Sequence, residues 1–291
     1  MSNAASKPTS GKLERPHMPY MDGILADLAS GEKEEVDVLW QRHLHWGYWA
    51  DPTTADGSVE DYAAASERLA QLHFDVANIK DGMRVVDCGC GVGGAIDSMN
   101  ERFSDVELVG LNIDERQLEV ARGRVHAKPG NSIEFVQGNA CELPFEDESF
   151  DAVTAVECIM HFPSRGQFLR EAARVLRPGG RLAITDIVPP LYALPVVLPT
   201  FALLMPRVMG FYGRTNKVPA PGIAYRRMAR KAGLVQRASI DITKESLPTF
   251  DVLARYFGTI DRAGDTDSRW MEKSFRYHTM DYRLLSFEKR A

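Results

Sequence analysis

A glycine-rich turn directly after a short apolar run is the feature that most constrains this fold. Val85 and Val86 lead into Asp87, and four glycines follow within six positions, at 89, 91, 93 and 94. β-Branched residues favour a strand, and glycines occur where the backbone turns tightly or approaches a ligand closely. The sequence therefore predicts a buried strand, a ligand-binding turn and then a helix, while a turn without a ligand is the alternative.

The acid ahead of the glycines narrows the choice of ligand. Gly89, Gly91 and Gly94 fit the pattern G-x-G-x-x-G, which several nucleotide sites share. Asp87 stands where a nicotinamide site usually has an apolar residue. A carboxylate there can hold a cation, such as the α-ammonium group of S-adenosylmethionine (SAM). The turn thus favours SAM, and a nicotinamide-dependent oxidoreductase is the disfavoured alternative.

Strand and helix patterns alternate from residue 84 onward. We expect strands at 84–88, 106–112, 133–137, 150–156, 181–188, 234–243 and 281–288, with helices at 93–102, 115–127, 164–176 and 224–232. A predicted helix stop and turn at 177–180 separates the helix at 164–176 from the strand at 181–188. Such regular alternation predicts an α/β fold with right-handed crossovers and a parallel sheet.

The remaining segments surround this core. We expect a disordered tail at 1–17, an N-terminal helical and aromatic cap at 18–60, and a SAM-binding core at 61–188. An apolar lid follows at 189–222, and residues 223–291 complete the core with a helical insertion at 246–277. Helices are expected at 21–40, interrupted by Ser30 and Gly31, and at 61–78.

The apolar stretch at 188–212 is long enough to raise the question of a membrane span. Its only charged residue is Arg207, and it holds five prolines, at 189, 190, 195, 199 and 206. Each proline removes a backbone donor and interrupts a helix, which would leave carbonyls unpaired in lipid. We therefore expect a lid over a substrate pocket rather than a spanning helix, with a dimer surface or a membrane-docking patch as alternatives.

Composition excludes several classes of protein. The net charge of −5 shows no basic surplus, which argues against a nucleic-acid substrate. Cysteines 88, 90, 141 and 158 form no disulfide framework, and no signal peptide opens the chain, so we expect a cytoplasmic protein. Cys88 and Cys90 are interpreted as small buried residues. His43 and His45 could ligate a metal, but without an accompanying acid or cysteine cluster we expect aromatic packing over a ligand and no metal site.

Ligands of open α/β sheets bind beyond the carboxyl ends of the strands. Asn112 ends the second predicted strand and could bond ribose hydroxyls, and Asn139 follows the third, where an amide could meet adenine. Turn formation and helix capping are the alternative roles of both asparagines. Taken together with Asp87, the ligand-binding interpretation is favoured.

Three further polar residues follow the fourth and fifth predicted strands. Glu157 and His161 come after the fourth, and Asp186 ends the fifth. His161 suits a general base, and Asp186 could orient it or bind substrate. A structural role for His161 at a helix start is the alternative.

Three motifs together resemble the class I SAM-dependent methyltransferases. They are residues 87–94, residues 143–153 (LPFEDESFDAV) and residues 174–181 (RVLRPGGR), in the family's order. The resemblance implies a Rossmann-like, mostly parallel seven-stranded sheet whose last strand is antiparallel, with helices on both faces. It also implies that Asp87 and Gly89 contact the methionine part of SAM, residue 112 the ribose and residue 139 the adenine. The family more often has acids at these last two positions. The full set of predicted cofactor contacts is Asp87, Gly89, Gly91, Gly93, Asn112, Gln117, Asn139, Ala140, Glu157, Trp46 and Tyr48.

Within the family, the chain is similar to natural-product enzymes such as sugar and mitomycin O-methyltransferases. These carry an entry segment like residues 45–49 (HWGYW), and some have His and Asp at the positions of His161 and Asp186. The chain is also similar to sterol and tocopherol C-methyltransferases, and residues 109–112 and 155–161 resemble the sterol branch.

The expected reaction is methyl transfer from SAM to a small, largely apolar metabolite. O-methylation with His161 as general base is favoured. C-methylation of a terpenoid, sterol-like or aromatic carbon, with Glu157 and His161 at the site, is the alternative. A SAM-binding protein without catalysis is a further one. We expect a small-molecule substrate, no nucleic acid and no stable membrane insertion, and a homo-oligomer stays open.

Overall fold

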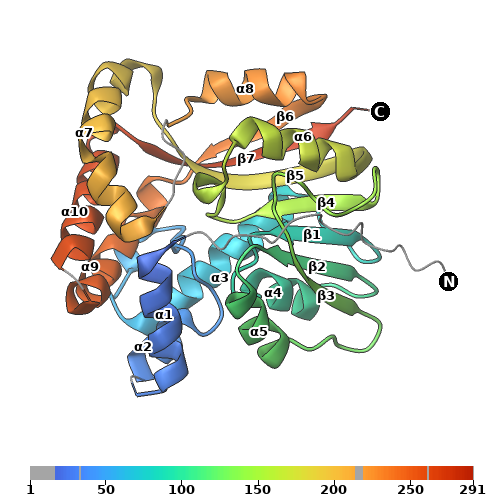
Figure 1. The fold of residues 1–291 in the computed structure, drawn as a ribbon, viewed down its shortest axis with the longest axis horizontal. Coiled ribbons are helices and arrows are strands. Elements are labelled where there is room, and N and C mark those ends of the chain that lie inside the picture. The colour runs from blue at the N-terminus through green and yellow to red at the C-terminus, as the bar shows by residue number, and fades with distance from the viewer. Residues whose placement is uncertain (1–16, 33, 214–218, 261, 291) are drawn as a thin grey trace.

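A seven-stranded sheet forms the centre of the structure, a computed structural model that describes residues 17–32, 34–213, 219–260 and 262–290. The strand order is β3-β2-β1-β4-β5-β7-β6 (Figure 1). The strands are β1 (Arg84–Cys88), β2 (Glu107–Asn112), β3 (Ser132–Gln137), β4 (Phe150–Ala155), β5 (Leu176–Val188), β6 (Leu234–Asp241) and β7 (Asp281–Lys289). The first five run parallel, and β7 is antiparallel to both of its neighbours. The predicted Rossmann-like sheet is confirmed.

Helices cover both faces of the sheet because successive strand residues point to opposite sides. Val85 packs into a cluster with α3 (Val59–Val76), α4 (Gly94–Arg102) and α5 (Glu115–Arg124). Val86, the next residue, packs into a second cluster with α6 (Arg165–Val175) and α8 (Gly222–Lys231). Figure 1 shows these two helical layers on either side of the strands. Both faces of the central strands are therefore buried against helices.

A helical cap gathers at one end of the sheet, on the left in Figure 1. It consists of α1 (Pro19–Ser30), α2 (Glu34–Trp40), α7 (Leu194–Tyr212), α9 (Thr249–Ile260) and α10 (Arg262–Arg276), with short 3₁₀ turns at η1 (Pro52–Thr54), η2 (Ile159–His161), η3 (Leu191–Ala193) and η4 (Lys244–Ser246) nearby. The ring of Trp40 lies edge-on to Tyr62 and Tyr256, with centroids 6.1 and 5.4 Å away. The N-terminal and C-terminal parts of the chain thus share one aromatic core.

Two elements differ from the sequence-based expectation. β5 begins at Leu176, so the predicted turn at 177–180 is instead an irregularity inside the strand, opposite Phe150–Ala152, with Gly179 at φ +79°. The segment of the predicted helical insertion at 246–277 contains the end of η4, then α9 and α10.

The second difference concerns the prolines of α7. The helix continues through Pro199 and Pro206, so the expectation that these two interrupt it was wrong. Each proline leaves the carbonyl four residues earlier without a helical donor. Those carbonyls belong to Pro195 and Ala202, which are both exposed, so water can serve them. Within the described residues, no helix combines the length and hydropathy needed to cross a bilayer. The predicted tail, except His17, and residues 214–218 of the predicted lid lie outside the described residues.

Candidate active site

The glycine turn joins β1 to α4 in a conformation that needs glycine. Gly89 has φ +82°, and its N–H donates to the carbonyl of Leu111 at 2.7 Å. A Cβ at Gly89 would lie 2.7 Å from Sγ of Cys158, which follows Glu157 after β4. The turn therefore has no room for a side chain at position 89, next to Cys158.

Asp87 lies at the end of β1 with only 2% of its surface exposed. Burial raises the pKa of its carboxyl to about 6, although the hydroxyl of Thr154, which donates to Oδ1 at 2.7 Å, acts in the opposite direction. A buried carboxylate beside a glycine turn is suited to a cationic ligand group. These residues fit the α-ammonium group of SAM.

The two asparagines form turns at the ends of their strands. Oδ1 of Asn112 accepts the N–H of Asp114 at 3.3 Å, and its Nδ2 donates to Gln117 at 3.1 Å. Oδ1 of Asn139 accepts the N–H of Cys141 at 2.9 Å, and Ala140 lies buried beside it. These hydrogen bonds are the turn-forming role that the sequence left open. Contacts with ribose and adenine stay predictions.

Residues 41–49, called the strap below, cross directly over the glycine turn. A Cβ at Gly94 would lie 1.9 Å from the carbonyl oxygen of Arg42, so the approach is possible only for glycine. The N–H of Trp46 donates to Oε2 of Glu157 at 2.7 Å, and the N–H of Gly47 donates to Oγ1 of Thr249 at 3.1 Å. The strap therefore connects the turn, the end of β4 and the start of α9.

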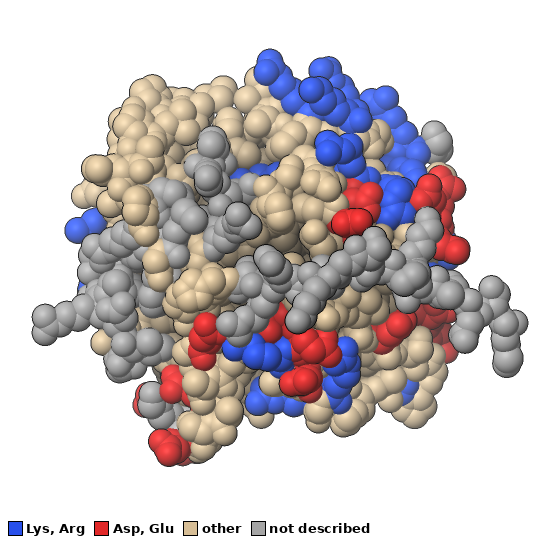
Figure 2. Space-filling model, in the orientation of Figure 1, with Lys and Arg blue, Asp and Glu red and all other residues tan. Residues whose placement is uncertain are grey.

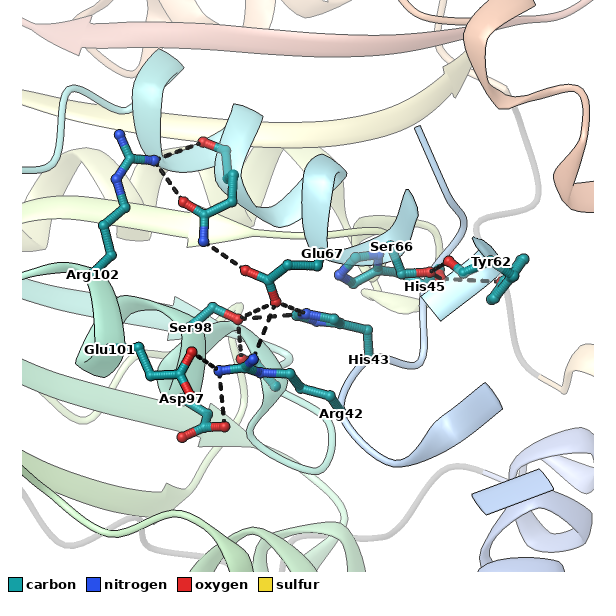
Figure 3. A network of polar contacts seen from close by, with 12 residues as sticks. Arg42, His43, His45, Tyr62, Ser66, Glu67, Asp97, Ser98, Glu101 and Arg102 are labelled. Atoms are coloured by element: carbon teal, nitrogen blue, oxygen red, sulfur yellow. Dashed lines mark hydrogen bonds and ion pairs between the residues drawn. The ribbon is translucent and has the colours of Figure 1, made fainter. Parts of the chain in front are cut away.

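A polar network fastens the strap to α3 and α4 (Figure 3). Nε2 of His43 lies 2.8 Å from Oε2 of Glu67, and the hydroxyl of Ser98 donates to the same oxygen at 2.7 Å. Burial alone would raise the pKa of Glu67, but hydrogen bonds from His43, Gln71 and Ser98 lower it to about 2.

The second histidine of the strap is held through its own backbone. The carbonyl of His45 accepts hydrogen bonds from Tyr62 and Ser66, and burial lowers the pKa of the His45 imidazole well below its usual value. The described residues hold no cluster of three potential metal ligands. In this structure His43 and His45 anchor the strap.

A cavity of about 130 Å³ opens beside the strap, between the cap and the sheet. Leu44 lies between the two sites: it lines the cavity, and its Cδ1 is 3.4 Å from where a Cβ of Gly91 would be. The other apolar and aromatic side chains of the wall are Ile24, Trp40, Trp46, Met160, Ile187, Phe201, Tyr212, Pro219, Phe250, Leu253, Phe257, Trp270, Met271 and Met280. Its polar members include Tyr20, Glu157, His161, Arg165 and Asp186. Such a lining suits a largely apolar ligand held by a few polar groups.

Glu157 contributes a carboxyl group to the cavity from directly after β4. Its backbone is left-handed, with φ +51°, and its N–H donates to the hydroxyl of Thr185 at 2.8 Å. Burial raises the pKa of Glu157, and hydrogen bonds from Trp46 and Tyr282 oppose this effect in part. The resulting pKa is about 8. Burial therefore favours the neutral form of this carboxyl group.

His161 ends η2 and lies in the wall of the cavity. Its Nε2 lies 3.2 Å from the hydroxyl of Tyr20, and the two rings stack with centroids 6.0 Å apart. Tyr20 comes from the first turn of α1, so the cap covers the imidazole.

Asp186 is fully buried at the same wall, in an ion pair with Arg165. Nε of Arg165 donates to Oδ2 at 2.6 Å and Nη2 to Oδ1 at 3.2 Å, while the hydroxyl of Tyr225 also donates to Oδ2. These bonds hold Arg165, which is 8% exposed, at the cavity. The predicted orientation of His161 by Asp186 stays a prediction.

Sequence reasoning missed four residues of this region: Tyr20, Arg165, Tyr225 and Tyr282. Arg165 lies four positions after His161, and Tyr282 is the second residue of the predicted last strand. Their positions relative to the strand ends could have suggested them. Tyr20 and Tyr225 lie on helices whose packing the sequence pattern does not reveal.

Comparison with known proteins agrees with this architecture. A family model described as a methyltransferase domain matches residues 86–184. The chain is 38% identical over 165 residues to methyltransferase GfsG of Streptomyces halstedii, covering 56% of this chain and 58% of that protein. It is 32% identical over 232 residues to the 27-O-demethylrifamycin SV methyltransferase of Amycolatopsis mediterranei (strain S699), covering 76% and 77%. The first match thus spans less than two thirds of the relative's length.

A solved structure shares the fold over nearly the whole chain. Geranyl diphosphate C-methyltransferase from Streptomyces coelicolor A3(2), in complex with Mg²⁺, geranyl diphosphate and S-adenosyl-L-homocysteine, superposes with a TM-score of 0.69. The identity is 20%, and the match covers 95% of this chain and 100% of the other. The sheet, the glycine turn and the identity to the rifamycin enzyme all point to one family. The chain belongs to the class I SAM-dependent methyltransferases.

Proposed function

We propose that this protein methylates an oxygen atom of a small, largely apolar metabolite, with His161 as the general base. The observation that carries the proposal is the place of His161 in an apolar cavity that adjoins the glycine turn through Leu44. SAM, when bound, supplies a methyl group that is already activated by its sulfonium. The protein's tasks are then to align the acceptor and to remove its proton.

The residues of the site divide these tasks. Asp87 and the glycine turn hold the amino-acid end of SAM, and Asn112, Gln117, Asn139 and Ala140 hold its nucleoside. The strap closes over the turn, and the aromatic wall of the cavity excludes water. His161, with its Nε2 beside the hydroxyl of Tyr20, takes the proton of the acceptor hydroxyl.

A C-methylation reaction is the second candidate, because Glu157 lies among aromatic rings. Trp46, whose N–H donates to Glu157, has its ring centroid 5.2 Å from Phe250 and 5.0 Å from Tyr282. Aromatic faces and a carboxyl that ionises when a cation forms would stabilise a carbocation. A carbon acceptor would need these groups more than it would need His161.

The test is product analysis by mass spectrometry with SAM that carries a deuterated methyl group. The acceptor panel consists of terpenoid, polyketide and glycoside compounds, each with and without its hydroxyl groups. O-methylation predicts label only in hydroxylated acceptors. Label in acceptors that lack hydroxyls would favour the carbon reaction, and tight SAM binding with no labelled product would favour a non-catalytic SAM-binding protein.

The role of His161 is tested by His161→Ala. We expect turnover to fall about 100-fold or more while SAM affinity stays unchanged, because a general base contributes on that order. Added imidazole should restore part of the turnover, which a merely structural loss would not permit. Tyr20→Phe keeps the base and should cost less. Unchanged turnover of His161→Ala would remove His161 from the mechanism.

A further inference from the structure

The outer face of α7 is apolar and exposed, although a helix that is apolar all round is normally buried. Its inner face contributes Val197 to the core and Phe201 to the cavity. On the outer side, Val196 is 61% and Leu203 79% exposed, and Leu191 and Tyr192 of the preceding η3 are 58% and 71% exposed. Exposed apolar patches of this kind mark contact with a partner or a membrane.

The charge of the surrounding chain is strongly one-sided. From residue 187 to 240 there are eight Lys and Arg residues and no Asp or Glu: Arg207, Arg214, Lys217, Arg226, Arg227, Arg230, Lys231 and Arg237. The other 237 residues hold 27 Lys and Arg against 40 Asp and Glu, a balance of −13. An acidic protein thus concentrates its positive charge in the segment that contains the exposed apolar helix.

Both features lie at the same side of the molecule. Figure 2 shows tan, uncharged side chains over the described part of α7 and a group of blue side chains over α8, along the upper edge. In α8 the side chains of Arg226, Arg227, Arg230 and Lys231 are exposed. Apolar side chains flanked by cations are what an anionic membrane surface accepts, with the former in the acyl boundary and the latter at the phosphates.

We propose that α7 and α8 form a docking surface for a bilayer that contains anionic phospholipids. A second copy of this chain would supply an apolar face but no matching negative charge, since a two-fold contact places the same basic segment on both sides. The binding is peripheral and depends on both the apolar and the basic residues.

The same segment forms part of the cavity, which connects docking with the proposed function. Ile187, Phe201, Tyr212 and Pro219 line the cavity from residues 187–240. A docked protein would therefore present this wall to the phase in which an apolar acceptor dissolves. This step rests on the proposed function, whereas the docking itself does not.

The experiment is flotation of the full chain with vesicles, with no acceptor present. Vesicles of phosphatidylcholine and phosphatidylglycerol are compared with vesicles of phosphatidylcholine alone. We expect binding to the anionic vesicles, lost at high salt. The double variant Arg226→Gln/Arg227→Gln should lower the partition coefficient roughly tenfold or more. The matched control, Lys80→Gln/Lys244→Gln, removes two exposed cations outside the segment and should bind like the wild type.

Val196→Gln/Leu203→Gln tests the apolar half of the surface. It should lower vesicle binding at least tenfold with an unchanged unfolding midpoint, because both side chains are mostly in solvent. Absence of binding to anionic vesicles, or equal losses in the control variant, would overturn the proposal. So would a dimer in sedimentation velocity that this double variant dissociates, because a second copy would then occupy the face. None of these readouts depends on methyl transfer.

Discussion

Asp87 shows how one buried residue couples the fold to the cofactor. Its carboxyl is 2% exposed, and Thr154 is the one hydrogen-bond donor described for its side chain. The free protein therefore holds this group with its pKa raised to about 6. A bound ammonium group would favour the ionised form and lower that pKa again. Proton binding and cofactor binding at Asp87 thus oppose each other.

The first prediction is that the affinity for SAM falls as the pH is lowered through about 6. Below this value the free site is protonated, so binding must release a proton, and affinity falls by up to about tenfold per pH unit. Calorimetric titration between pH 5 and 8 measures it. Thr154→Val removes the donor that lowers the pKa of Asp87, so its transition should move to higher pH. Asp87→Asn should bind weakly at every pH. A pH-independent affinity of the wild type would contradict the assignment of Asp87 to the ammonium group.

At the scale of elements, the strap and the turn make one unit because two backbones touch at Gly94. The contact is between the N-terminus of α4 and the carbonyl of Arg42, and the network of His43 and Glu67 holds it from the other side (Figure 3). Moving the strap would also move Leu44 and Trp46, which line the cavity. The geometry of the cofactor turn and that of the acceptor cavity are therefore linked through residues 41–49.

A matched pair of glycine variants tests this contact. Gly94→Ala places a methyl group 1.9 Å from a backbone oxygen, so the strap must move, and we expect about 1–3 kcal/mol of lost stability and weaker SAM binding. Gly123→Ala, in α5, meets nothing within 4 Å and should stabilise the protein by about 0.5–1 kcal/mol. Urea unfolding and SAM titration measure both. Equal, small effects of the two variants would show that the strap does not depend on Gly94.

Elements were predictable from the sequence where local signals agreed, and less so where tertiary contacts decide. The strand that ends at Asp87 and the glycine turn were predicted because burial pattern, glycine and acid occur together. The continuation of α7 through Pro199 was not predicted. The free-energy cost of a proline inside a helix depends on whether the freed carbonyl reaches water. The left-handed Gly179 hid the start of β5, since a turn and a strand irregularity have the same local signature.

The candidate site followed the same rule. Glu157, His161 and Asp186 could be predicted because the first two follow the fourth strand and Asp186 lies near the end of the fifth, and all three line one cavity. Tyr20 reaches that cavity from α1, 141 residues before His161 in the chain, and only the packing determines that placement. The exposure of Val196 likewise depends on how α7 lies on the cap, which an evenly apolar segment does not show.

At the scale of the whole molecule, the cap and the sheet are interlocked rather than merely adjacent. Trp40 of the N-terminal cap packs on Tyr256 of α9, and the hydroxyl of Tyr256 donates to Asp27 of α1 at 3.0 Å. The backbone of Trp49 donates to Glu245, and that of Trp46 to Glu157 at the end of β4. Unfolding of the cap alone would expose apolar side chains of the part that contains the sheet, and the reverse also holds. We therefore expect the two halves to unfold together.

The four tryptophans allow a direct test, because they all lie in the cap or the strap, at 40, 46, 49 and 270. Tryptophan fluorescence then follows that part, whereas far-ultraviolet circular dichroism follows the helices and strands of the whole chain. We expect both signals to give the same urea midpoint, as two-state unfolding requires. SAM at 100 times its Kd should raise the unfolding free energy from both signals by about 2.7 kcal/mol. A fluorescence transition at lower urea that SAM leaves unchanged would mean that the cap opens by itself, and that the strap does not transmit cofactor binding to the acceptor cavity.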